Sequence, residues 1–198
     1  MKTNNGTLMD DALRTLEGKW RLAIKATIIY LLILLLLRGI PVLGAIASLV
    51  VSGPLLIGWA KFWLTFSRNQ EATIHQIFSG FDSWTRAFNA YVLVALYTLL
   101  WSLLFIIPGI IASFSYSQTF YIMAEDPTIH PRDAIRKSKE MMNGYKWKLF
   151  GLRLRFIGWG ILSILTLGIG FLWLVPYIQT TVSKFYDDVA HSQNQTME

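Results

Sequence analysis

The sequence predicts an all-α, polytopic membrane protein whose six transmembrane helices form three hairpins, each preceded by a short cytoplasmic amphipathic helix. Three observations predict this fold. Of the 198 residues, 54% are hydrophobic and only 15% are charged, whereas soluble domains carry about 25% charged residues. The mean hydropathy is +0.44. Finally, six apolar segments follow one another along the chain, and a repeated sequence pattern groups them in pairs.

The clearest repeat relates Asp11–Leu22 to Asp133–Leu149. In both segments an Asp-Ala-aliphatic-Arg helix start leads to a glycine, a tryptophan beside basic residues, and a long apolar stretch. A weaker third copy lies between them, and its tryptophan gives the series Trp20, Trp84 and Trp147. Self-similarity at a regular period is typical of internal structural repeats. We therefore expect a single integral membrane domain over residues 1–198, with pseudo-threefold parallel repeat units at about 7–66, 71–123 and 130–186.

In the first unit, residues 7–18 form an amphipathic helix, because apolar residues recur in them at helical spacing. Thr7 is its expected N-cap. Trp20–Leu37 follows as the first span, since its length at 1.5 Å per residue covers a hydrocarbon core of about 30 Å. The chain then turns, and Val42–Phe66 forms the second span, in which Pro54 is expected to cause a kink.

In the second unit, Thr73 and Gln76 form a capping-box pattern that opens a short surface helix. Trp84–Ile107 is the predicted third span and Ile110–Met123 the fourth. The charge-free turn Pro108-Gly109 joins them, and so short a loop forces an antiparallel hairpin.

In the third unit, Pro131 suits the first turn of an amphipathic helix that ends at Asn143-Gly144. Its basic face carries Arg132, Arg136, Lys137 and Lys139. The fifth and sixth spans follow at Trp147–Leu165 and Phe171–Tyr186, joined by a turn at residues 166–170.

The distribution of basic residues predicts the topology. Lys and Arg gather before the odd-numbered spans, whereas Arg38 alone lies on the opposite side. Because this bias in short loops sets orientation, both termini should be cytoplasmic in a multi-pass protein of the plasma membrane. The net charge of +6 fits attraction to anionic lipid headgroups, since the basic residues flank apolar segments. We expect no nucleic-acid partner. A protein partner or a homo-oligomer stays open.

Enzymatic activity is not expected. The three histidines are isolated, cysteine is absent, and no zinc-binding helix, nucleophile elbow or phosphate-binding glycine loop occurs. We therefore expect no catalytic residue, no cofactor and no metal site.

Four polar residues inside the predicted spans are candidate ligand-binding residues, because ionisable and polar groups in a membrane are costly and often functional. Arg153 and Arg155 lie about 9–12 Å beyond Trp147 along the fifth span. Either they form a cationic, inward-facing site, or the hydrocarbon span is a shorter one at residues 156–168 and both arginines lie before it. Gln118 and Gln179 occupy matching positions in the fourth and sixth spans. They either bond neighbouring helices or line a polar cavity at the repeat interface.

The second half of the chain resembles a known family. The residues that carry the resemblance are Tyr116–Pro127, Asp133–Met142, Gly144–Phe150, Leu165–Gly170 and Pro176–Thr180. In them the chain is similar to the multi-pass membrane proteins of Gram-positive bacteria grouped as domain of unknown function nine-seventy-five. The resemblance extends over nearly the whole chain and is most specific in its second half. It implies a bacterial plasma-membrane protein with several helices, and it supplies no substrate or catalytic residue.

Two functions are compatible with these observations. The first is a non-enzymatic membrane protein that binds or transports an anionic lipid or small solute, through Arg153, Arg155 and the glutamines. The alternative is a membrane scaffold or interaction protein, of the immunity or envelope-stress type, that acts through its basic cytoplasmic helices.

Overall fold

A computed structural model describes residues 3–39 and 41–197, and every element of secondary structure in those residues is a helix. In chain order the elements are α1 Asn5–Leu16, α2 Trp20–Arg38, α3 Pro41–Ser67, the 3-10 helix η1 Ile74–Ser83, α4 Trp84–Leu104, α5 Ile106–Ser115, α6 Thr119–Glu125, α7 Pro131–Met141, α8 Lys146–Leu165 and α9 Phe171–Met197. The all-helical class predicted from the sequence is thus confirmed for the described residues.

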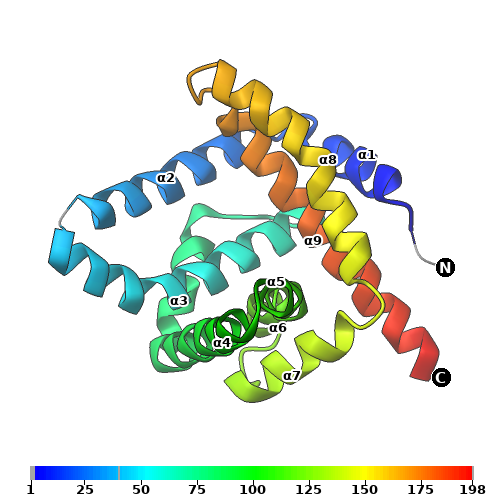
Figure 1. Ribbon diagram of the computed structural model, residues 1–198. Coiled ribbons are helices and arrows are strands. Elements are labelled where there is room, and N and C mark those ends of the chain that lie inside the picture. The colour runs from blue at the N-terminus through cyan, green and yellow to red at the C-terminus, as the bar shows by residue number, and fades with distance from the viewer. Residues whose placement is uncertain (1–2, 40, 198) are drawn as a thin grey trace.

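Three helix pairs, α2–α3, α4–α5 and α8–α9, extend in different directions from a common base (Figure 1). The α2–α3 pair points to the left in Figure 1, the α8–α9 pair points to the top, and α4 and α5 are seen nearly end-on. Both termini lie on the right of this view, away from the tip of the α2–α3 pair.

Three helical segments are long and apolar enough to cross a membrane within the described ranges: Trp20–Leu37, Ala47–Ser67, and Ile74–Leu104, which joins η1 to α4. The first two agree with the predicted spans. α8 carries four basic residues in its first half, and α5 and α6 are each too short to span on their own.

The hairpin between α4 and α5 turns earlier than the sequence predicted. Phe105 has an extended backbone (φ −160°, ψ 151°) and ends α4, whereas Pro108 lies within the first turn of α5. A proline is tolerated there because the first-turn N–H groups have no helical partner to lose. Gly109 then lets the two helices approach closely, since a Cβ on it would lie 2.2 Å from the Ser102 Oγ. Gly170 meets Ser163 in the same way across the α8–α9 hairpin, at 2.8 Å.

The predicted fourth span is wrong as a continuous helix, because it is broken between α5 and α6. The hydroxyls of Ser115 and Ser117 bond back to carbonyls of their own turn, which competes with regular helical bonding. The break is held by Ser138 of α7. Its hydroxyl donates to the Ser115 carbonyl at 2.8 Å and accepts from the Gln118 backbone N–H at 3.2 Å. An α7 side chain thereby replaces bonds that the interrupted helix lacks.

The amphipathic helices follow the predicted pattern with one correction. The N-cap of α1 is Asn4, whose side chain accepts from the Gly6 N–H, and not Thr7, which lies inside the helix. The capping box of Thr73 and Gln76 is present at the start of η1. α7 buries its apolar side and Ser138, and it exposes the basic residues Arg132, Arg136, Lys137 and Lys139.

The core lies at the base of the three pairs. One apolar cluster joins α1, α3, α4, α6, α7, α8 and α9, and a second cluster joins α1, α2, α3 and η1 around Trp59, Phe62 and Trp63. α3 and η1 touch through their backbones, since a Cβ on Gly58 would lie 1.9 Å from the Ile77 carbonyl oxygen. α3 contains Pro54, against which Gly80 of η1 packs at similarly close range.

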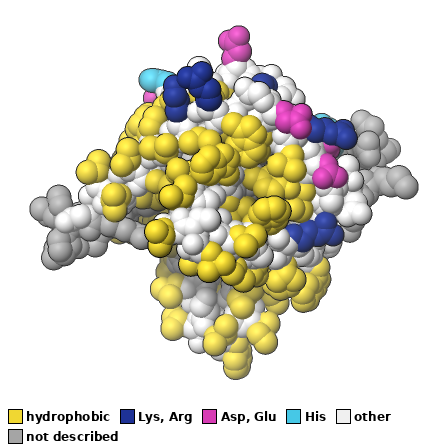
Figure 2. Space-filling view, turned by 90° about the horizontal axis from the view of Figure 1, so that it is seen from above, with side chains coloured by type: hydrophobic (Ala, Val, Ile, Leu, Met, Phe, Trp, Pro, Cys, Tyr) yellow, Lys and Arg dark blue, Asp and Glu magenta, His cyan; other side chains and the backbone are white. Residues whose placement is uncertain are grey.

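Large apolar side chains remain exposed toward the three tips, among them Leu36, Ile106 and Leu167, which are 74%, 77% and 95% exposed. Figure 2 shows one face of the molecule, in which apolar side chains occupy the centre and the lower lobe while charged side chains lie along the upper and right margins. Such extended apolar surface marks an interaction with a membrane or a partner.

Candidate functional site

The two predicted site arginines lie on opposite sides of α8. The Arg153 guanidinium lies 5.2 Å from the centre of the Phe114 ring, on the side that faces α5. Arg155 lies beside the start of α1, where a Cβ on Gly6 would be 3.6 Å from its Nη1. Residues two apart on a helix are separated by about 200°. The structure therefore does not bring the two guanidinium groups together, and both side chains are exposed.

The two predicted site glutamines, one at the start of α6 and one on α9, have different partners. The Gln179 Oε1 accepts a hydrogen bond of 3.3 Å from the Tyr121 hydroxyl. Gln118 is fully buried, and its amide donates to the Ser117 hydroxyl at 3.1 Å. Its Oε1 has no partner among the described residues. Gln118 thus holds the Ser117 side chain, whereas Gln179 bonds Tyr121.

Gln179, Tyr121 and Ser117 line one cavity of about 250 Å³ at the junction of α2, α3, α6 and α9. Its lining also includes Tyr30 and Trp59, whose ring centroids are 4.1 Å apart in a stacked arrangement. This cavity combines hydroxyl and amide groups with aromatic rings and has no charged lining residue within the described part of the chain.

A second cavity, the α5–α8 groove, has apolar walls with cationic residues at its margins. It has a volume of about 330 Å³, and it is lined by Ile107, Ile110, Ile111, Phe114, Asn143, Gly144, Lys146, Trp147 and Phe150. Phe150 contacts both Phe114 and Trp147 edge to face. Lys146 borders the groove directly, and Arg153 covers the Phe114 ring. Lys146 and Arg153 are seven residues apart, about 10 Å along α8.

A third cavity lies on an adjacent face of α5, and we name it the α4–α7 cavity. It has a volume of about 300 Å³ and is lined by Trp101, Pro108, Ile111, Ala112, Ser115, Tyr116, Lys139 and Lys146. Neither Lys139 nor Lys146 is predicted as a site residue from the sequence. Lys139 belongs to an exposed basic face, and Lys146 is one of several cations that predict topology, so neither has a local pattern that distinguishes it.

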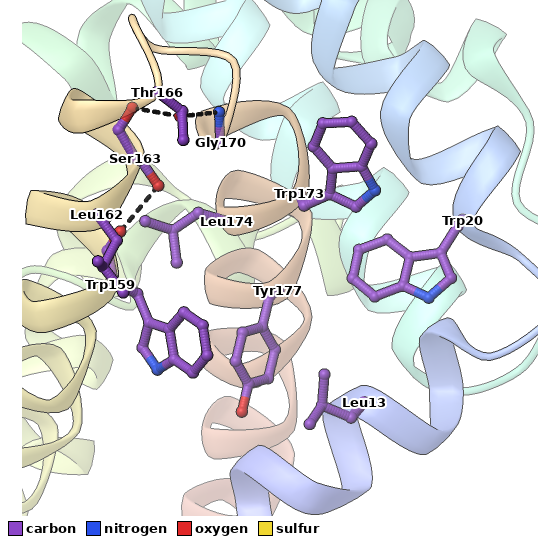
Figure 3. A pocket seen from close by; sticks show the side chains of 10 residues that line it. All are labelled: Leu13, Trp20, Trp159, Leu162, Ser163, Thr166, Gly170, Trp173, Leu174 and Tyr177. Carbon is purple, nitrogen blue, oxygen red and sulfur yellow. Dashed lines mark hydrogen bonds between the residues drawn. The ribbon is translucent and has the colours of Figure 1, made fainter.

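The largest of these apolar cavities lies at the α8–α9 tip (Figure 3) and measures about 380 Å³. Trp20, Trp159, Trp173 and Tyr177 surround it, from α2, α8 and α9. The polar groups of the adjoining turn bond to one another, with Thr166 accepting from the Gly170 N–H. Trp20 therefore lies beside this tip. Trp147 is twelve residues before Trp159, about 18 Å along α8. Trp20 and Trp147 therefore lie at different heights along α8.

Charged groups at the base of the helix pairs form ion pairs with one another. Arg68 bonds Glu125 at 2.6 Å and Asp187 at 2.7 Å, and the Tyr186 hydroxyl also donates to Glu125. The hydrogen bond to Asp187 raises the pKa of Arg68 above its ordinary value, against the opposing effect of partial burial. Burial would raise the pKa of Glu125, but the bonds from Tyr186 and Arg68 outweigh it and hold that pKa below its ordinary value.

A second ion pair at the base joins α8 to α9. Lys148 of α8 and Asp188 of α9 are 2.5 Å apart, and their side chains are only 13% and 11% exposed. The Asp188 carboxylate also accepts from Thr3, and the Asn5 amide donates to the Lys148 carbonyl. These charges hold the N-terminus, α8 and α9 together, so their role is structural. Within residues 3–39 and 41–197, no three His, Asp or Glu side chains are placed to hold a metal ion.

Comparison with known proteins identifies a family for the second half of the chain. No curated protein and no solved structure matches the sequence. Residues 103–193 match the family described as "Protein of unknown function (DUF975)". The matched segment contains α5 to α8 and most of α9, and with them the whole α5–α8 groove. The sequence resemblance is therefore confirmed as a match to this family over residues 103–193.

Proposed function

We propose that this chain is a non-enzymatic, multi-pass membrane protein that binds or moves an anionic lipid. The three helical segments long enough to span a bilayer support the membrane setting, and so do the exposed apolar tips of all three helix pairs. In this proposal the tips enter the bilayer of a bacterial plasma membrane, and the charged base with both termini stays in the cytoplasm.

The observation that carries the lipid-binding role is the α5–α8 groove. Its walls are aliphatic and aromatic, and it opens beside Lys146 at one margin and Arg153 near the other. An anionic lipid has the matching chemistry, because its acyl chain is apolar and its phosphate is negative. Trp147, which is 82% exposed, suits the interface between headgroups and hydrocarbon. Arg153 contributes to this site, whereas Arg155 faces α1.

Native mass spectrometry of the detergent-extracted chain tests the proposal. We expect diacyl phosphatidylglycerol to be retained in preference to phosphatidylcholine with the same acyl chains. Lys146→Gln and Arg153→Gln should each weaken phosphatidylglycerol retention about five-fold, since a cation near a membrane surface contributes about 1 kcal/mol to anionic lipid binding. Lys25→Gln is the matched control, because this exposed lysine of α2 lines neither cavity beside α5. Equal retention of the two lipids by the wild-type chain would refute the proposal.

The proposed topology has six crossings in three hairpins, with α5 and α6 together forming the fourth crossing, and reporter fusions test it. A phosphatase joined after Glu198 should be inactive, and one inserted beside Phe105, at the tip of the α4–α5 hairpin, should be active. Active phosphatase at both positions, or at neither, would place the two points on one side of the membrane and exclude the six-crossing arrangement.

The scaffold function has one supporting observation, the exposed basic face of α7. Neutralising Lys137, which lines neither cavity beside α5, separates the two functions. A scaffold would lose a co-purified protein partner in Lys137→Gln, whereas a lipid-binding protein would keep its bound phosphatidylglycerol.

A further inference from the structure

Two cavities of similar size meet at Lys146 and Ile111. The α5–α8 groove and the α4–α7 cavity measure about 330 and 300 Å³, and these two residues line both. The two cavities lie on adjacent faces of one helix. Ile107, Ile110, Ile111 and Phe114 face the groove, whereas Pro108, Ile111, Ala112 and Ser115 face the cavity. Each set has the i, i+3, i+4, i+7 spacing of a single helix face, and one set is offset from the other by one residue.

The charges at this junction have one sign. Lys146 borders both cavities, Lys139 of α7 borders the α4–α7 cavity, and no carboxylate lines either one in the described part of the chain. Neither lysine forms an ion pair among the residues that the structure describes, in contrast to Lys148 and Arg68 at the base. A pair of apolar cavities that meet beside two available cations is complementary to an anionic group that carries two apolar chains.

We infer that the ligand of this site is a diacyl anionic glycerophospholipid. Its phosphate contacts Lys146 and Lys139, one acyl chain occupies the α5–α8 groove, and the other occupies the α4–α7 cavity, so that α5 lies between the two chains. This inference rests on the proposed lipid-binding function and adds the number of chains. It also brings α7 into the site through Lys139, the residue next to the Ser138 that holds the α5–α6 break.

The test compares three ligands on the full, detergent-solubilised chain by native mass-spectrometric titration. They are diacyl phosphatidylglycerol, lysophosphatidylglycerol with one chain, and diacyl phosphatidylcholine. We expect one diacyl phosphatidylglycerol per chain and at least about ten-fold weaker binding of the lyso form, because one cavity then stays unfilled by lipid. Lyso and diacyl forms that bind equally well would overturn the two-chain inference and leave the proposed function standing. Phosphatidylcholine that binds as well as phosphatidylglycerol would overturn both.

A variant that blocks one cavity gives an independent readout. Of the two cavities, Ile110 lines only the α5–α8 groove. Ile110→Trp should therefore weaken the binding of diacyl phosphatidylglycerol to about the affinity of the lyso form. Binding of the lyso form should change by no more than about two-fold, since its single chain can still occupy the α4–α7 cavity. Ile106→Trp is the matched control, because Ile106 is 77% exposed and lines neither cavity. Equal loss of both lipids in Ile110→Trp would contradict the inference. If this variant does not fold, the comparison of ligands on the native chain decides.

Discussion

Ser138 gives the sharpest test of how the broken helix is held. Its side chain is fully buried, and its hydroxyl bonds both the Ser115 carbonyl and the Gln118 N–H. Ser138→Ala would leave these two buried backbone groups without that partner, and each unsatisfied group costs about 1–3 kcal/mol. We therefore expect a loss of about 3 kcal/mol in the free energy of unfolding. For a chain of this size that corresponds to a decrease in Tm of about 6–12 °C.

Thermal unfolding in detergent, followed by the fluorescence of the eight tryptophans, measures this decrease. Ser113→Ala is the matched control on α5. Its hydroxyl is exposed and bonds only the Ile110 carbonyl of the same helix, so its removal should change Tm by less than about 2 °C. If Ser138→Ala and the control have the same Tm, α7 does not hold the break between α5 and α6.

Three further predictions concern packing and charge at the base. Gly58→Ala should lower Tm strongly, because its Cβ would lie 1.9 Å from a backbone oxygen of η1; Gly158→Ala, which meets no atom within 4 Å, should leave Tm unchanged or slightly raised. Lys148→Met should cost about 3 kcal/mol by leaving Asp188 buried and unpaired, and Lys148→Met/Asp188→Leu should recover part of that loss. A double variant no more stable than the single one would contradict this. Because the pKa of Glu125 is held below its ordinary value of 4.5, its contribution to stability is present above that pH and is lost as the pH falls through the lowered pKa. Glu125→Gln should therefore flatten the acid side of a stability-versus-pH curve, and an unchanged curve would count against the Arg68 network.

Local patterns in the sequence were sufficient for most individual helices. The start of α2 at Trp20, the capping box at Thr73 and the buried side of α7 all follow from signals within a few residues of one another. The same holds for Gly144, whose φ of 76° suits the predicted end of the α7 segment, since a left-handed residue favours glycine. Periodicity and capping act locally, so the sequence alone carries them.

The break in the fourth span was not predictable in this way. The hydrogen bonds at the break come from Ser138, which lies some twenty residues farther along the chain. The apolar sequence across Ser115 otherwise has the pattern of one continuous spanning helix. The turn at Phe105 was missed for a related reason. Pro108 is a strong turn signal in sequence, yet a proline fits the first turn of a helix equally well, and only the packing of Gly109 on Ser102 fixes where α5 begins.

The placement of the candidate site residues depends on contacts between helices, which the sequence does not reveal. Arg153 was a candidate from its sequence position alone, and the structure places its guanidinium over the Phe114 ring of α5. The sequence grouped Arg153 with Arg155, although two residues along a helix point to opposite sides. Lys146 was missed because its significance depends on α5, a separate helix that brings two cavities to its side.

Native mass spectrometry of the wild-type chain and two variants determines whether an anionic lipid binds beside α5. We expect bound phosphatidylglycerol in the wild type and in Lys25→Gln, and a clear loss of it in Lys146→Gln. Equal retention of phosphatidylglycerol by Lys146→Gln and Lys25→Gln would contradict this expectation.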